Sequence, residues 1–305
     1  MSRVAVFLGS DFLYRLRTDP VAVGALSVVT LFVLAAVFAP WLSVMNPHDP
    51  AQIDIMNSEM PPVWQDGGEA PFLFGTDAQG RDLWSAILYG LRISITIGVF
   101  AVLVQMVLGI TIGLLSGYLG GKVDAFFMRL ADIQLAMSTL MLAIVALAVF
   151  QAAFGAELFE DLAIVMLVLV IGFAEWPQYA RTIRASVLAE RKKEYVDAAR
   201  VIGLSAPVIM VRHILPNTLS PLLVISTVQV ANAIISEAAL SFLGLGMPVT
   251  KPSLGSLISA GFEYIFSGAW WITTIPAIVL IVLILAINLL GDWLRDVLNP
   301  RLYKG

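Results

Sequence analysis

The 305-residue chain contains no cysteine and only two histidines, His48 and His213. Without cysteine the chain can form no disulfide and no thiolate metal site, and two histidines are too few for a histidine-based metal cluster. Charge is also scarce, because Asp, Glu, Lys and Arg make up 13% of the residues, whereas a soluble domain has about a quarter. The composition therefore excludes a disulfide scaffold and argues against an ordinary soluble domain.

Recognisable catalytic motifs are missing as well. The only Gly-Lys pair, Gly121-Lys122, is followed by Val123, and Ser116 stands where a phosphate-binding loop needs its first glycine. No nucleophile and base pair can be identified. We expect no catalytic residue, no metal and no cofactor on this chain, and no nucleic-acid partner.

Long apolar runs dominate what is present. Hydrophobic residues make up 59% of the chain, and no Lys or Arg occurs in residues 93–121 or 264–292. A helix needs about 20 residues to cross a hydrocarbon core of roughly 30 Å. We predict an all-α, polytopic membrane protein with six transmembrane helices, at residues 21–39, 93–117, 133–151, 162–180, 218–240 and 272–290. A cleaved signal peptide is the competing interpretation of the first run, but the long lead favours an uncleaved anchor.

The basic residues indicate the orientation. With the N-terminus inside, 15 of the 18 lie in cytoplasmic segments, and the outer side keeps Arg81, Arg92 and Lys251. Both termini are then cytoplasmic. We divide the chain into residues 1–90 (cytoplasmic lead, first span and an acidic, proline-rich outer excursion), residues 91–298 (five-span core with a cytoplasmic loop at 182–216) and a tail at 299–305.

The cytoplasmic loop contains an amphipathic pattern. On a helix over residues 190–202, one face would carry Tyr195, Ala198, Ala199 and Ile202. Gly203 follows where a left-handed C-cap needs a glycine. Ser205 would cap a second short helix, which should end near Leu215 because Pro216 cannot continue its hydrogen bonds. An ordinary loop helix and a docking element that fits a partner's groove are both open from the pattern alone.

These residues resemble a known family. Asp197-Ala198-Ala199, Gly203 and Ile214-Leu215-Pro216 are similar to the EAA loop of bacterial ABC importer permeases, with Asp197 in place of the usual Glu and His213 in place of an Ile. Two further runs, GTD-x-x-GRD at 75–82 and LSFLGLG at 240–246, resemble the dipeptide and oligopeptide (peptide/nickel) permeases. PPVWQDGG at 61–68 adds a resemblance to their second-permease (C-type) dipeptide branch. The resemblance implies a type I importer permease-like fold in the bacterial inner membrane.

The resemblance also implies partners and a role for the loop. The coupling helix would sit on an ATPase subunit through Glu194, Asp197, Ala198, Ala199, Gly203, Leu215 and Pro216. The assembly would contain a second related permease subunit, two ATP-binding subunits that hold ATP and Mg, and an extracytoplasmic solute-binding protein. It would import dipeptides or oligopeptides, and nickel complexes or glutathione are alternatives. A stand-alone secondary transporter or channel is the competing class, and it should show ionisable groups near mid-membrane.

Smaller candidate sites lie in the predicted spans. Gln229, Asn232 and Glu237 are pathway or gate candidates, and Glu237 could instead tie the following loop or be a solvated helix-end carboxylate. The glycines at 109, 113 and 117 form a smooth ridge that would allow close helix contact. Asp77 or Asp82 could cap the helix that enters the membrane. Glu175 is expected to pair with Arg181 at the interface.

Overall fold

The computed structural model describes residues 11–298, which are largely helical and contain no strand. The first ten residues of the predicted lead and the predicted tail at 299–305 lie outside the described residues. Helices make up 76% of the structure, in agreement with the predicted all-α class.

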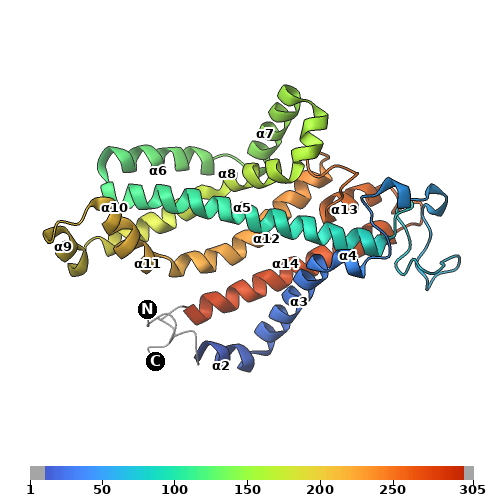
Figure 1. Cartoon of the computed structure of the whole chain (residues 1–305), viewed down its shortest axis with the longest axis horizontal. Helices are drawn as coiled ribbons and strands as arrows, with labels where there is room; N and C mark the ends of the chain where they lie inside the picture. Colours follow the sequence, from blue (N-terminus) through green and yellow to red (C-terminus); the bar gives the residue numbers. More distant parts are fainter. Residues whose placement is uncertain (1–10, 299–305) are drawn as a thin grey trace.

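Five long helices run roughly along the long axis of the molecule (Figure 1): α3 (Pro20–Val37), α5 (Leu83–Leu119), α8 (Ala156–Glu190), α12 (Ser220–Phe242) and α14 (Trp271–Leu298). The short α9 (Glu194–Val201) lies at one end of this axis, and the irregular segment 43–82, with its 3-10 turns η1 (Pro50–Gln52) and η2 (Ile55–Asn57), lies at the other. Short helices α2 (Asp11–Thr18) and α4 (Ala39–Leu42) flank α3.

Among residues 11–298, four helices are long and apolar enough to cross a membrane: α3, α5, α12 and α14. The bent pair α6 (Gly121–Leu135) and α7 (Thr139–Phe154) would make a fifth span. The chain thus crosses the membrane several times, while the expected count of six spans and the orientation of the termini stay predictions.

The largest internal interface joins α5 to α8 (Ala156–Glu190), and the three ridge glycines lie in it. A Cβ on Gly109 would stand 2.2 Å from Cβ of Tyr179, and one on Gly113 would stand 2.5 Å from the carbonyl oxygen of Ala180. A Cβ on Gly117 would overlap the side chain of Val187 in the same way. No side chain fits at these positions, so the two helices approach to backbone contact.

The expected third span over 133–151 is wrong in its boundaries. The helix breaks between Leu135 and Thr139, and α6 and α7 meet at 91°. Gln134 lies at the break, where its Nε2 donates to the carbonyl oxygen of Ala174 (3.0 Å) and its Oε1 accepts from Nε1 of Trp176 (2.8 Å). These bonds fix the end of α6 to α8, and α7 projects from the side of the bundle (Figure 1).

The expected Glu175–Arg181 pair is also wrong. Glu175 accepts instead from Oγ1 of Thr139 (2.5 Å) and Nε2 of Gln178 (2.7 Å), while Arg181 pairs with Asp132 on α6. Six helical positions separate residues 175 and 181, more than one and a half turns, so the two side chains point in different directions. The helix itself passes Pro177 without ending and reaches Glu190.

The end of the molecule opposite α9 differs from expectation in two ways. α5 begins at Leu83, ten residues before the predicted span, and Asp82 caps it by accepting from the backbone N–H of Ser85 (2.9 Å). A short helix that the sequence did not predict, α13 (Leu254–Phe262), lies in the connection between α12 and α14 and opens with a capping box of Ser253 and Ser256.

Candidate functional site

The segment between α8 and α12, residues 191–218, is here called the coupling segment. After α8 and one turn, α9 covers Glu194–Val201, and Gly203 has the expected left-handed φ of +83°. The second helix extends further than expected. It starts at Ala206, widens into a π-helix over Ile209–Ile214 and continues as α11 (Leu215–Thr218).

The π-helix explains why Pro216 does not end this second helix. In a π turn the N–H bonds shift to the fifth residue back, so one residue can lack its donor without breaking the run. Pro216 then occupies the first turn of α11, where a missing N–H costs little. Ser205 makes no side-chain capping bond, contrary to expectation.

The buried face of α9 is shifted from the predicted one. Val196 and Ala199 are buried and pack in one cluster with Ile209 and Ile214 of the returning helix. Ala198 is exposed, and Ile202 is 74% exposed. The predicted face correctly includes Tyr195 and Ala199, but its other two members, Ala198 and Ile202, are exposed. Residues of intermediate polarity in this helix are compatible with two different buried faces.

Polar contacts bind the coupling segment to the membrane helices. Nη1 of Arg191 donates to the carbonyl oxygens of Gly117 (2.8 Å) and Tyr118 (3.2 Å), at the end of α5. The guanidinium of Arg200 lies over the ring of Tyr118, 5.6 Å from its centroid. These contacts connect the coupling segment to α5, a helix of 37 residues that extends about 55 Å.

A third contact joins the segment to α8. The hydroxyl of Tyr195 donates to Oε2 of Glu190 (2.6 Å) and accepts from Nδ2 of Asn217 (3.3 Å). Burial and the neighbouring carboxylate raise the pKa of Tyr195 to about 12, so this hydroxyl keeps its proton at neutral pH. The Tyr195 hydroxyl thus connects Glu190, just before the coupling segment, to Asn217 near the end of the segment.

The exposed side of the coupling segment carries small and charged residues, and two apolar residues are exposed at the end of α9. Glu194, Asp197, Ala198, Gly203 and Pro216 are exposed, Ala199 is buried, and Leu215 is intermediate. Val201 and Ile202, called the tip here, are 86% and 74% exposed. Sequence reasoning missed Val201 altogether. The sequence signal for it is the β-branched pair Val201-Ile202 directly before the C-cap glycine in a charged loop.

The three pathway candidates fall into two places. Gln229 and Asn232 line a groove of about 700 Å³ between α8, α12 and α14, which also receives Asp292 and Arg295. Nδ2 of Asn232 donates to Oε1 of Gln229 (2.9 Å). Glu237 lies two turns further along α12, away from this groove.

Glu237 is 0% exposed, so the solvated helix-end interpretation is wrong. Its two oxygens accept from Oγ of Ser94 on α5 (2.8 Å) and from Oγ of Ser241 (2.7 Å). Ser241 also accepts from Oγ of Ser253 (3.3 Å), the cap of α13. The carboxylate therefore ties α5, α12 and the start of α13 together.

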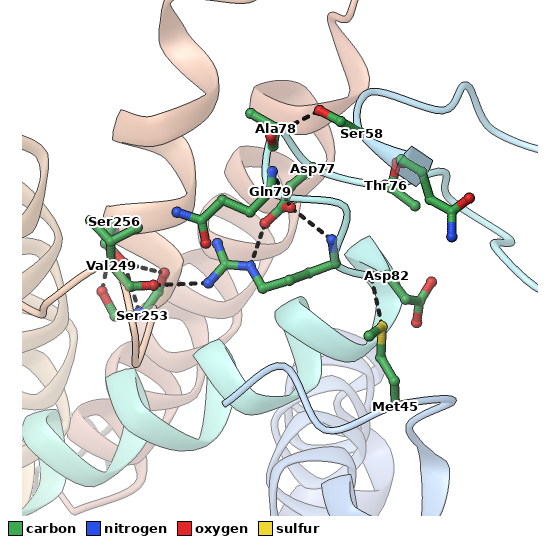
Figure 2. A network of polar contacts seen from close by, with 12 residues as sticks. Met45, Ser58, Thr76, Asp77, Ala78, Gln79, Asp82, Val249, Ser253 and Ser256 are labelled. Atoms are coloured by element: carbon green, nitrogen blue, oxygen red, sulfur yellow. Dashed lines mark hydrogen bonds and ion pairs between the residues drawn. The ribbon is translucent and has the colours of Figure 1, made fainter. Parts of the chain in front are cut away.

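A second buried network lies beyond it (Figure 2). Nε of Arg81 donates to Oδ2 of Asp77 (2.6 Å), and Nη1 of Arg81 donates to the carbonyl oxygen of Val249 (2.8 Å). Both charged residues are buried. This pair joins the turn at 77–81 to the connection that precedes α13. Among the described residues, no group of three or more His, Cys, Asp or Glu could hold a metal.

The structure is a bundle of apolar helices, with the short helix α9 exposed at one end and a hydrogen-bonded polar network at the opposite end. The fold is similar to the MetNI methionine ABC transporter in inward-facing conformations, with TM-scores of 0.54 and 0.53, 17% and 20% identity, and coverage of 70% of this chain and 96% of that one. At this identity the likeness shows the fold alone.

The chain belongs to the family of binding-protein-dependent transport system inner membrane components, whose model matches residues 109–304. Residues 8–62 match the N-terminal TM domain of oligopeptide transport permease C. Among curated relatives, the di/tripeptide transport system permease protein DppC of Pseudomonas aeruginosa is 38% identical over 92% of this chain and 88% of that protein. The dipeptide transport system permease protein DppC of Escherichia coli is 37% identical over 96% and 93%. The chain is thus a multi-pass protein of the bacterial inner membrane.

Proposed function

We propose that this chain is one of two related membrane subunits of an ATP-driven importer of dipeptides or oligopeptides. Two separate ATP-binding subunits hydrolyse ATP with Mg, and an extracytoplasmic solute-binding protein delivers the peptide. The relatives are dipeptide and di/tripeptide permeases, which supports peptides over nickel complexes or glutathione as the substrate. The family description, which names dependence on a binding protein, supports the importer over a stand-alone transporter.

The coupling segment carries the proposal. A groove on an ATPase subunit can enclose α9, because its outward side offers Ala198, Gly203 and the apolar tip. When two ATPase subunits close on ATP, the helix moves with its groove. Arg191 and Arg200 pass this movement to α5, and the continuous α8 passes it directly into the membrane.

The peptide would cross between the two permease subunits. In this chain the groove with Gln229 and Asn232 supplies polar groups for the pathway, and it lies beside the helices that the coupling segment moves. Glu237 would hold the opposite end of α12 against α5 and α13 while the other end moves. Selectivity then depends largely on the solute-binding protein.

Reconstitution tests the proposal. The chain is placed in liposomes with its partner permease, both ATPase subunits and the dipeptide-loaded binding protein, and uptake of labelled dialanine is measured. We expect dipeptide uptake that requires ATP on the side of the ATPase subunits and the binding protein on the opposite side of the membrane. Uptake that follows an ion gradient without ATP would instead support a secondary transporter.

A further inference from the structure

The end of the molecule opposite α9 is strongly acidic. Residues 42–82 and 243–270, called the outer segments here, contain eight carboxylates and two basic residues, a formal charge of −6, whereas the whole chain carries −4. Burial lowers the pKa of His48 below its usual 6.5, with Arg81 adding to the effect, so this imidazole contributes no positive charge at neutral pH. Of the two basic residues, Arg81 is buried against Asp77. The exposed charge of this end is therefore almost entirely negative.

Large apolar side chains stand among these carboxylates. Met56 is 90% exposed, Ile55 is 76% exposed, and Phe266 is 92% exposed. Asp54, Glu59 and Glu263 are exposed close to them in the sequence. Exposed apolar residues rimmed by polar groups are typical of protein–protein contact surfaces.

The segment with Ile55 and Met56 is held in a fixed position. A Cβ on Gly80 would stand 2.1 Å from the carbonyl oxygen of Asp54, so this segment packs on the turn at 77–81. Oγ of Ser58 donates to the carbonyl oxygen of Ala78 (2.8 Å), as Figure 2 shows. Because Arg81 fixes that turn to Val249, the exposed side chains sit on a rigid base.

A pocket of about 380 Å³ lies between the same turn and α13, and Asp77, Arg81, Glu263 and Tyr264 are among its lining residues. The charges of Asp77 and Arg81 compensate each other at 2.6 Å. Glu263 makes no ion pair within residues 11–298 and is the uncompensated charge of the pocket. A pocket with this charge accepts a Lys or Arg side chain.

We propose that Asp54, Ile55, Met56 and Glu263, called the outer patch, dock a solute-binding protein that presents basic residues around an apolar contact. A basic side chain of that protein enters the pocket beside Glu263, and Ile55 and Met56 are the apolar anchors. The family description requires a binding protein, and the outer patch lies at the end opposite the coupling segment (Figure 1). This inference rests on the proposed function and its orientation.

Charge reversal tests the outer patch. The complete transporter is placed in nanodiscs, and the Kd of the purified dipeptide-loaded binding protein of the same system is measured in 50 and 300 mM NaCl. The variants are Asp54→Lys, Glu263→Lys, the double variant and Met56→Ser. The matched control is Glu160→Lys, which reverses an exposed carboxylate at the start of α8, outside the outer segments. Retention of the ATPase subunits during purification checks that each variant is folded.

We expect each reversal to weaken binding at least about fivefold in 50 mM NaCl, and the double variant to lose most of the salt dependence that the parent shows. Met56→Ser should weaken binding at both salt concentrations, and Glu160→Lys should bind like the parent. Parent-like binding by the double variant, or equal weakening by Glu160→Lys, would overturn the outer patch. Dipeptide uptake by the unmodified transporter is measured in parallel, and its absence would count against the proposed function instead.

Discussion

Arg191 and Gly117 are 74 residues apart in the chain, yet Nη1 of Arg191 donates to the carbonyl oxygen of Gly117 at 2.8 Å. The last carbonyls of a helix have no partner within the helix. Arg191 therefore satisfies the end of α5 from the first residue of the coupling segment. Gly117 also lies where α5 touches α8, so this bond stands at the junction of three elements.

Removal of this bond should impair coupling. Arg191→Ala deletes a charged hydrogen bond worth about 1.5 to 3 kcal/mol, and we expect the variant to retain its ATPase subunits but to transport fewer peptides for each ATP hydrolysed. Lys192→Ala, at an exposed neighbouring position, is the control. The measurement is the ratio of peptide uptake to ATP hydrolysis in proteoliposomes. A parent-like ratio in Arg191→Ala would show that this bond plays no part in coupling.

The glycine ridge gives a prediction about stability. A side chain at residue 113 would overlap the backbone of Ala180 and the side chain of Ile183, and overpacking typically costs about 1 to 3 kcal/mol. Gly113→Leu should lower the thermal unfolding temperature in detergent and reduce assembly. Gly24→Leu on α3, where nothing lies within 4 Å, should leave both unchanged. Equal unfolding temperatures for the two variants would contradict the close α5–α8 contact.

Glu237 gives a prediction about transport. Glu237→Gln keeps the size of the side chain but replaces one of the two oxygens that accept from Ser94 and Ser241 with an NH2 donor. We expect slower dipeptide uptake with complete assembly of the transporter. Ser27→Ala on α3, whose hydroxyl bonds only within its own helix turn, is the control. Unchanged uptake kinetics in Glu237→Gln would limit this carboxylate to a packing role.

The orientation can be tested with single cysteines, because the chain has none of its own. Cysteines at Glu69 and Glu157 should react from outside with an impermeant thiol reagent in intact cells. Cysteines at Lys193 and at Lys304, which lies outside the described residues, should react only after the cells are opened. Labelling at residue 193 from outside would contradict the predicted topology.

The sequence predicted the class of fold because apolar runs and sparse charge determine which segments can lie in a bilayer. It placed Gly203 correctly because few other residues adopt a φ of +83° without strain. It missed the start of α5 because Arg92 appeared to limit the apolar run, although an exposed arginine can lie on a helix that continues past it.

Other features depend on contacts between distant segments. The break at residues 136–138 follows from the bonds of Gln134 to α8, and the π-helix from the packing of Ile209 and Ile214 on α9. Glu237 accepts from Ser94 on α5, 143 positions before it, and its other partner, Ser241, accepts from Ser253, 16 positions after Glu237. Periodicity within one segment contains no information on such partners.

The tip of α9 is the most direct test of the coupling segment. Ala199→Glu is a poor probe of docking, because Ala199 is buried within the segment and a glutamate there would disturb its own packing. Ile202 is exposed, so Ile202→Asp should leave the fold intact while placing a charge in the ATPase groove. Gly203→Val adds strain, since a β-branched residue tolerates a positive φ poorly.

The decisive measurement is the amount of ATPase subunit that copurifies with each variant, together with the uptake of dipeptide for each ATP hydrolysed. Ile202→Val is the matched control, because it keeps an apolar tip. We predict that Ile202→Asp and Gly203→Val lose the ATPase subunits or hydrolyse ATP without uptake, while Ile202→Val behaves like the parent. Full ATPase binding and full coupled uptake in both Ile202→Asp and Gly203→Val would contradict the assignment of α9 as the coupling site.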